Sequence, residues 1–242
     1  ISAYGAPEVN SPNVGALARE GVVFENAYAP VPRTLPSHAS MLTGKSPLVH
    51  GVFDNGTYQL AAGHRTLAEE LRMAGFNTAA FVSALVLESR FGLDRGFDVY
   101  DDEMAKAAFI GERRGDLTTA RAIEWLERHA GERNFLFLHL FDPHAPYQAP
   151  EPFASRIRTA YRDYPPFVQD YVAEIAFTDH CSGQLLRRLV ELGLYDSSMI
   201  CVTADHGESH GEHGEFTHGF FIYTSTMKVP LMLKVPGVRG ML

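Results

Sequence analysis

The chain has 242 residues, 45% of them hydrophobic, which is enough for one sizeable globular core. Its formal net charge of −8 at pH 7 argues against a nucleic-acid backbone as a partner, and no run of eighteen apolar residues predicts a membrane span. The two cysteines, Cys181 and Cys201, are too few for a disulfide framework and lack metal-ligand spacing, so they leave the redox compartment open.

The first third of the chain alternates between helical and extended patterns. Residues 11–20 predict a short helix with a Ser cap and a Pro at the first position, and residues 22–28 predict a strand. Residues 66–74 predict a second helix, because Thr66 and Glu69 have capping-box spacing. A short buried strand is expected at 77–83.

The rest of the chain continues this alternation after an ordered loop expected at 88–103. Strands are expected at 134–141, 198–203 and 229–235, and helices at 117–129 and 168–192, with a Pro-rich loop reaching to about residue 166. Strands that alternate with helices predict an α/β fold, with a mostly parallel sheet sandwiched between helices.

The turn around Thr34 is the first candidate for chemistry. Two prolines fix the approach, and a short helix is expected over 37–42, with Gly44 as its left-handed cap. Thr34 would then precede a helix N-terminus, where free N–H groups and the dipole attract an anion. A hydroxyl held beside an anion suits attack on a phosphate or sulfate ester. The alternative is a capped surface turn, with Thr34 and Ser37 bonding only to their neighbours.

Two further polar clusters follow predicted strands, where ligands bind in parallel α/β sheets. One is the turn at 142–147, in which His144 is the site candidate. The other is Asp205-His206, whose oxygen and nitrogen donors suit Zn²⁺ or Mn²⁺, whereas His is a poor ligand for Ca²⁺. The alternative for this pair is a capping Asp beside a solvated His. We expect the three clusters to converge on one site.

The remaining histidines divide into possible ligands and structural residues. His210, His213 and His218 follow Asp205-His206 in a Gly/Glu-rich loop and extend the cluster of possible ligands, with His210 expected to be solvated. His139 lies inside an apolar run and is expected to be a core or supporting histidine. Structural or surface positions are expected for His50, His64, His129 and His180.

Three motifs in order carry a resemblance to a known family. Thr34-Leu35-Pro36-Ser37-His38, followed by Met-Leu-Thr-Gly at 41–44, resembles a nucleophile signature of the form Cys/Ser-x-Pro-Ser-Arg with a Leu-Thr-Gly ending. Residues 142–147 resemble that family's substrate-histidine turn, and residues 205–214 resemble its C-terminal metal motif. The chain therefore resembles the sulfatase family of the alkaline-phosphatase superfamily over nearly its whole length, and the resemblance implies that fold.

The resemblance also implies an activity. It makes Thr34 the nucleophile and His144 a catalytic contact to the ester. Asp205 and His206 stand where that family has ligands of a divalent metal ion, with Mn²⁺ or Zn²⁺ favoured by the Asp-His pair and Ca²⁺ an option. The implied function is metal-dependent cleavage of a phosphate or sulfate ester, with a small anionic ester as the partner.

Substrate-binding roles are implied for three more residues. His38 replaces the signature's arginine, Asn55 falls where relatives place a polar contact to the anion, and His218 falls at a position often held by a lysine. Sulfatases oxidise Cys or Ser to formylglycine, which threonine cannot form. Thr34 instead resembles the phosphodiesterase and phosphotransferase branches, so phosphoryl transfer is favoured. His38 makes a weaker anion clamp than arginine would.

The family's first metal-binding aspartates lie on a strand before the segment that resembles Tyr4-Gly5. The family's small C-terminal subdomain is not among residues 1–242. The resemblance thus predicts a single sulfatase-like catalytic domain at 1–242 that is incomplete at both ends. The alternative function is a catalytically inactive sulfatase-like fragment or a non-catalytic binding relative.

Overall fold

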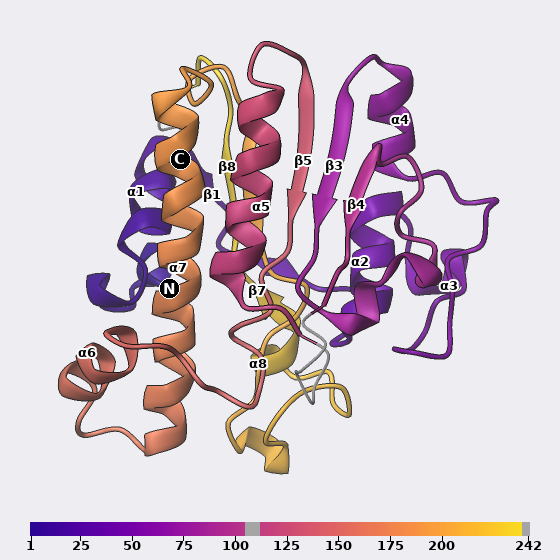
Figure 1. The fold of residues 1–242 in the computed structure, drawn as a ribbon. Coiled ribbons are helices and arrows are strands. Elements are labelled where there is room, and N and C mark those ends of the chain that lie inside the picture. Colours follow the sequence, from indigo (N-terminus) through magenta and orange to yellow (C-terminus); the bar gives the residue numbers. More distant parts are fainter. Residues whose placement is uncertain (105–111, 239–242) are drawn as a thin grey trace. The chain divides into compact units, whose positions relative to one another are not determined.

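A computed structural model describes residues 1–104 and 112–238 of the chain (Figure 1). The described chain divides into two compact units, each assembled from segments that are distant in sequence. The first unit comprises residues 1–27, 142–204 and 230–238, and the second comprises 28–104, 112–141 and 205–229. Thr34 and Asp205-His206 both belong to the second unit, whereas His144 belongs to the first.

The second unit contains a parallel three-stranded sheet in the order β4-β3-β5 (Figure 1). Strands β3 (Asn77–Phe81) and β5 (Asn134–Leu138) confirm two predicted strands. Strand β4 (Val99–Asp101) lies in the stretch predicted to be a loop, which is a correction. Three residues are too few to show a period, and the strand exists because Ala79, Ala80 and Phe81 pair with it.

Side chains of this sheet alternate between two helical layers, as a strand's period of two requires. Ala80 and Val82 belong to one apolar cluster with Leu35 and Leu42 of α2 (Thr34–Thr43). Phe81 points the other way and shares a hollow with Trp125 of α5 (Gly115–Arg128), which packs on β3 and β5. The sheet is thus covered by helices on both faces, which confirms the predicted fold class.

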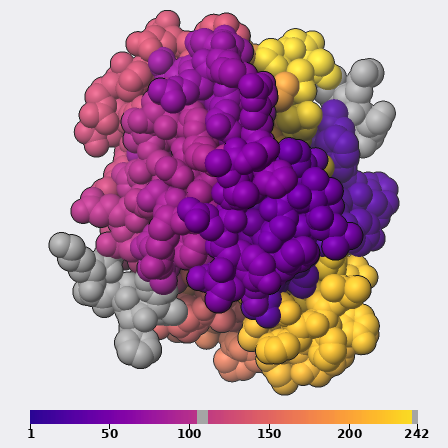
Figure 2. Space-filling model, turned by 90° about the vertical axis from the view of Figure 1, so that its right-hand side faces the viewer, coloured from indigo at the N-terminus to yellow at the C-terminus, as the bar shows by residue number. Residues whose placement is uncertain are grey.

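Two shorter helices complete the α2 side of this unit. Helix α4 (Leu67–Met73) begins with the predicted capping box, in which Thr66 accepts from the N–H of Glu69 and the Glu69 carboxylate accepts from that of Thr66. Helix α3 (Pro47–His50) lies between α2 and α4 in sequence. The purple residues around these helices occupy the centre of the side view in Figure 2.

The first unit is built on helix α7 (Pro166–Glu191), which contacts α1 (Pro12–Glu20) and α6 (Phe153–Ala160). Asp179 of α7 is buried and accepts from the N–H groups of Asn13 and Val14 at 3.1 and 2.8 Å, so it caps α1. Helices α1 and α7 were predicted, whereas α6 lies in the stretch expected to be a loop. None of the helices within the described residues is long and apolar enough to cross a membrane.

Antiparallel pairing in the first unit departs from the expectation of parallel strands. Its sheet has the order β1-β8-β6, with β8 (Leu231–Lys234) antiparallel to both β1 (Val22–Val23) and β6 (Ile200–Thr203). The predicted strand at 229–235 is split, because Pro230 has no N–H to donate to a ladder.

The other elements are short. Strand β7 (Lys228–Val229) pairs with β2 (Ala27–Tyr28), the second half of the predicted strand at 22–28. Helix α8 (Thr224–Met227) precedes β7. Single 3-10 turns are formed by Ser2–Tyr4, Glu8–Asn10, Leu85–Leu87, Ser89–Phe91 and Glu212–Gly214.

Candidate active site

Helix α2 begins at Thr34, three residues earlier than the sequence predicted, because Arg33 is the last extended residue. Pro36 then stands in the first turn, where a missing N–H breaks no intrahelical bond. The helix ends at Gly44 with φ of 65°, as predicted. Thr34 is therefore the first helical residue, and its side chain leaves the helix at the positive end of the dipole.

The backbone amides at this N-terminus are mostly engaged, which corrects the expectation of free N–H groups. The N–H of Leu35 donates to Oδ1 of Asn55 at 2.8 Å, and that of Ser37 donates to the carbonyl of Arg33 at 3.1 Å. Pro36 has no N–H. An anion near Thr34 would therefore rely on side chains, among them the amide NH₂ group of Asn55, whose Oδ1 is already occupied.

The side chains of Thr34 and Asp205, both singled out from the sequence, lie close to that of His206. Its Nε2 lies 3.4 Å from Oγ1 of Thr34 and 3.3 Å from Oδ2 of Asp205. Zinc ligands at 2.0–2.1 Å in a tetrahedron are about 3.4 Å from one another, so the spacing of these atoms matches a divalent ion of that size. Thr34 is buried, exposing only 2% of its surface, which keeps the hydroxyl out of bulk water.

The Asp205 carboxyl is held in its ionised form. Burial raises its pKa, but His206, His38 and His139 together outweigh burial and bring the pKa below its ordinary value. The main chain of Asp205 is fixed from α2, since Oγ of Ser37 donates to its carbonyl at 2.7 Å. An ionised carboxylate on a fixed backbone meets the requirement for a metal ligand.

His38 lies beneath Thr34 with only 2% of its surface exposed. Its Nδ1 donates to the carbonyl of Thr34 at 2.8 Å and lies 3.7 Å from Oδ2 of Asp205. Burial lowers the pKa of His38, so its ring is neutral near pH 7. Its ring packs edge-to-face with the ring of His139, and the two ring centroids are 4.9 Å apart. Its predicted contact to substrate stays a prediction.

The loop after β6 folds back on itself. The N–H of Ser209 donates to the carbonyl of Thr217 at 2.9 Å, which brings Glu208 beside His218. Gly207 permits this path, because a Cβ there would lie 2.1 Å from the carbonyl oxygen of Ser225. The rings of His206 and His218 stack, with their centroids 3.9 Å apart. Two residues that the sequence offered as possible ligands therefore lie side by side.

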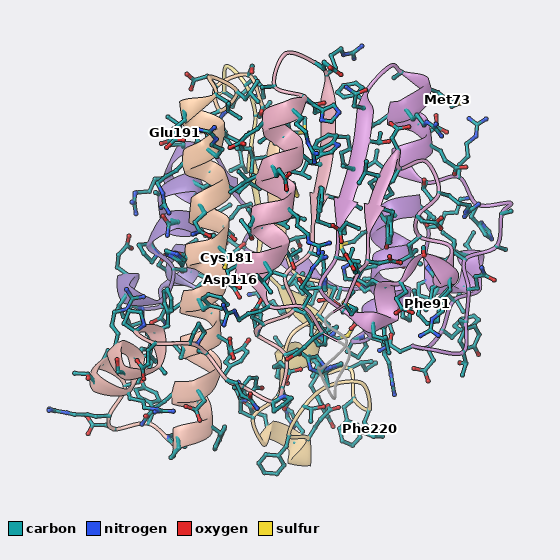
Figure 3. All side chains as sticks on the ribbon, in the orientation of Figure 1. Met73, Phe91, Asp116, Cys181, Glu191 and Phe220 are labelled. Carbon is teal, nitrogen blue, oxygen red and sulfur yellow. The ribbon has the colours of Figure 1, made fainter. Side chains whose placement is uncertain are left out.

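The other two histidines of this loop lie differently. His213 is exposed and stacks on Tyr223, and burial lowers the pKa of the half-buried His210, which was expected to be solvated. Phe220, labelled in Figure 3, lies on the segment that follows His218 and exposes 82% of its surface.

Sequence reasoning missed two charged residues here. Glu208 joins His206 and His218 in a group of three ligand atoms that all lie within 4.8 Å of one another. Arg33 precedes Thr34, pairs with Asp54 at 3.0 Å and donates to the carbonyl of Gly219 at 3.2 Å. Their adjacency to Thr34 and to the Asp205-His206 pair was the available signal.

His144 belongs to the first unit. Its Nδ1 donates to the carbonyl of Ala145 at 2.6 Å, and its side chain is partly buried. Its predicted contact to the ester, like the substrate-binding roles of Asn55 and His218, stays a prediction.

Comparison with known proteins gives a family match over almost the whole chain. The family model described as Sulfatase matches residues 1–240. An ulvan-active sulfatase from Formosa agariphila is 27% identical, with 97% of this chain aligned to 53% of that protein. Human iduronate 2-sulfatase is 24% identical, with 98% of this chain aligned to 57% of that protein. The chain thus spans somewhat more than half the length of these relatives.

Solved structures give the same fold. The crystal structure of a phosphonate monoester hydrolase from Agrobacterium radiobacter superposes with a TM-score of 0.80 at 20% identity, covering 98% of this chain and 65% of that one. A structure of BT4656 in complex with D-glucosamine-2-N,6-O-disulfate superposes with a TM-score of 0.78 at 21% identity, over 98% and 68% of the two chains. At these identities the likeness concerns the fold.

Proposed function

Because the chain belongs to the sulfatase family of the alkaline-phosphatase superfamily, we propose that it is a metal-dependent hydrolase that cleaves a phosphate or sulfate ester through Oγ1 of Thr34. The observation that carries this proposal is the meeting of Thr34 and Asp205 at Nε2 of His206, at 3.4 and 3.3 Å. A hydroxyl, an ionised carboxylate and an imidazole at these distances form the start of a metal-assisted nucleophile site.

Asp205 and His206 would hold the divalent ion. Nδ1 of His206 donates to the carbonyl of Gly207 at 2.9 Å, which fixes the tautomer that leaves a lone pair on Nε2. An imidazole beside a carboxylate suits Zn²⁺ or Mn²⁺ better than Ca²⁺. When bound, the ion lowers the pKa of the nearby hydroxyl and neutralises charge on the ester oxygens.

The protein's own groups position the reaction. The Thr34 oxygen forms a bond to phosphorus or sulfur as its proton leaves to solvent, and the bond to the alcohol oxygen breaks, with that oxygen taking up a proton. Water then cleaves the threonine ester and releases the inorganic anion. Asn55 would donate to the ester oxygens through its amide NH₂ group, and His144 and His218 would do so from Nε2 in their doubly protonated form. The α2 dipole would stabilise the negative charge that develops on these oxygens.

Two observations favour different esters. Relatives such as the ulvan-active sulfatase carry sulfatase names, which favours a sulfate ester. Threonine in place of Cys or Ser favours a phosphate ester, because threonine cannot be converted to formylglycine and has to act as an alkoxide. The residue at the reacting position bears directly on the chemistry, so we place phosphoryl transfer first.

The test is a panel of nitrophenyl phosphate, bis(nitrophenyl) phosphate and nitrophenyl sulfate, assayed with Mn²⁺, Zn²⁺ and Ca²⁺ in turn. We expect phosphate or diester turnover that Thr34→Ala abolishes and Thr34→Ser partly retains. The matched control is Thr43→Ala on the same helix, whose hydroxyl donates to the carbonyl of Ala39 and accepts from the N–H of Lys45, both at the far end of the helix from Thr34. Turnover that survives Thr34→Ala would overturn the proposal. Silence on every substrate with metal bound would favour the non-catalytic alternative.

A further inference from the structure

The loop after β6 contains a hollow of about 410 Å³. Residues 214–217 line it, together with Phe220 and Phe221. The three aromatic residues of this lining, Phe216, Phe220 and Phe221, expose 71%, 82% and 44% of their surfaces. Aromatic side chains gathered around a hollow, with a few polar groups among them, are typical of a site for a small organic ligand.

Glu215 is the acidic residue of the lining, and only 5% of its surface is exposed. Its Oε1 accepts from the N–H of Phe220 at 2.9 Å, so the carboxylate joins the two segments that line the hollow. Its Oε2 is buried and has no hydrogen-bond partner among residues 1–104 and 112–238. A buried carboxylate oxygen in this state costs free energy unless a donor or a cation reaches it. This oxygen is the observation that points to a ligand.

The polar groups of the lining indicate which ligand fits. The hydroxyl of Thr217 is already engaged, because it donates to the carbonyl of His218 at 3.2 Å and accepts from the N–H of that residue. A sugar has several hydroxyls to satisfy, and a hard metal ion needs several oxygen ligands, so neither matches one carboxylate oxygen among aromatic rings. An organic ammonium group matches it, since aromatic faces and a negative charge both attract it.

We propose that Glu215, with Phe216, Phe220 and Phe221, binds an ammonium group carried by the alcohol portion of the ester. The ring faces attract the positive charge, and the carboxylate pairs with it. The inference rests on the proposed function in taking the ligand to be part of the ester. It adds a substrate class, the esters of amino alcohols, and a specificity-determining residue, Glu215.

The hollow adjoins the segment that presents the nucleophile. His218 and Gly219 lie between the two stretches of chain that line it. Nδ1 of His218 donates to the carbonyl of Pro32 at 3.0 Å, and the guanidinium of Arg33 donates to the carbonyl of Gly219 at 3.2 Å. Because Pro32 and Arg33 immediately precede Thr34, the hollow is placed to hold the alcohol portion of an ester that Thr34 would attack.

Binding of choline to the unmodified protein, measured by titration calorimetry without ester or metal, tests the site directly. The matched probe is 3,3-dimethylbutan-1-ol, which has the same shape with a neutral carbon in place of the nitrogen. We expect choline to bind at least about tenfold more tightly, because only the cation gains from the carboxylate and the ring faces. Equal binding of the two probes would indicate a purely apolar hollow and overturns the inference. Absence of choline binding, or tighter binding of methyl glucoside, also overturns it.

Variants locate the binding. Glu215→Gln keeps an oxygen to accept from the N–H of Phe220 but removes the charge, so choline affinity should fall at least about tenfold. Phe220→Leu replaces an exposed ring by an aliphatic side chain and should weaken binding about threefold or more. The controls are Glu70→Gln, which removes an exposed charge of α4, and Ile222→Ala, which removes an exposed apolar side chain two residues beyond Phe220. Both should bind choline as the unmodified protein does.

Unchanged choline affinity in Phe220→Leu and in Glu215→Gln overturns the inference. If Glu215→Gln does not fold, Phe220→Leu alone decides, because its side chain is largely in solvent.

Turnover of two phosphate esters tests whether the ammonium group belongs to the substrate. We expect kcat/KM to be at least about tenfold higher for choline phosphate than for 3,3-dimethylbutyl phosphate. Glu215→Gln should remove most of this preference and keep turnover of the neutral ester. Equal kcat/KM for the two esters in the unmodified protein overturns the assignment to the alcohol portion.

The two proposals can fail separately. If choline binds through Glu215 and no ester is turned over, the proposed function fails while the ammonium site stands. If Thr34-dependent turnover occurs and choline neither binds nor improves the ester, the ammonium site fails while the function stands.

Discussion

The hydroxyl of Ser37 donates a hydrogen bond of 2.7 Å to the main-chain carbonyl of Asp205. This bond joins the first turn of α2, which presents Thr34, to the segment that carries the metal-ligand candidates. The two partners are 168 residues apart in the chain. The position of Thr34 relative to Asp205 and His206 is therefore held in part by this serine.

Ser37→Ala is expected to lower metal affinity and turnover together, because Asp205 loses its anchor. The free energy of unfolding should fall by about 1 kcal/mol for the lost hydrogen bond. Chelator competition and denaturant unfolding measure the two effects.

Ser37→Thr keeps a hydroxyl and should restore metal affinity. Ser40→Ala, on the same helix, removes a hydroxyl that bonds the carbonyl of Pro36 and Nε2 of His50 in α3, and should alter stability alone. Equal metal affinity in Ser37→Ala and Ser40→Ala would contradict the anchoring role.

Gly207→Ala should displace the loop after β6, which begins at Asp205 and His206. A Cβ at this position would lie 2.1 Å from the carbonyl oxygen of Ser225, which is backbone and cannot swing aside. We expect a loss of about 1–3 kcal/mol in stability and weaker metal binding, measured by thermal melting and zinc titration. Gly131→Ala is the control, because a Cβ there would meet no atom within 4 Å. A variant that melts and binds zinc as the unmodified protein does would refute the close approach.

Long periodic elements could be predicted from the sequence, and short paired ones could not. Helix α7 has an apolar period over 26 residues, and the capping box at Thr66 is local. Strand β4 has three residues, and only its pairing with β3 makes it a strand. Helix α2 was predicted to begin three residues late, because Pro36 is compatible with the first or the third position of a helix.

The candidate site shows the same limit. Asp205 and His206 could be found because adjacent ionisable residues follow an apolar strand. Glu208 could not be chosen from the acidic residues around it, since its place beside His218 depends on a backbone bond between Ser209 and Thr217. The amide of Leu35 was expected to be free, and only the folded chain brings Asn55 against it.

Arg113 is expected to be essential for stability. It is 3% exposed and ion-paired with Asp101, and it also donates to the carbonyl of Val82 at 3.0 Å. Burial raises the pKa of Asp101, but its bonds to Arg113 and Arg121 outweigh burial and lower it. Arg113→Met should reduce the free energy of unfolding by about 3–5 kcal/mol, since it leaves the largely buried carboxylate of Asp101 and the buried carbonyl of Val82 poorly paired. Arg121→Met removes a more exposed partner and should reduce it by about 1 kcal/mol or less. Similar denaturant midpoints for the two variants would contradict this ranking.

His38 should make the protein less stable as the pH falls through the ordinary imidazole value of 6.5. Burial lowers the pKa of His38 in the folded state, so between that lowered value and 6.5 the unfolded chain binds the additional proton. The free energy of unfolding therefore rises with pH in this window, by up to about 1.4 kcal/mol per pH unit for one proton. Above pH 6.5 the protonation of His38 no longer changes it. His38→Gln should reduce the slope of unfolding free energy against pH between 5 and 7, measured by denaturant titration. His213→Asn, which removes an exposed imidazole, should keep the slope. An unchanged slope in His38→Gln would show that the buried ring of His38 is protonated in the folded protein as readily as in the unfolded chain.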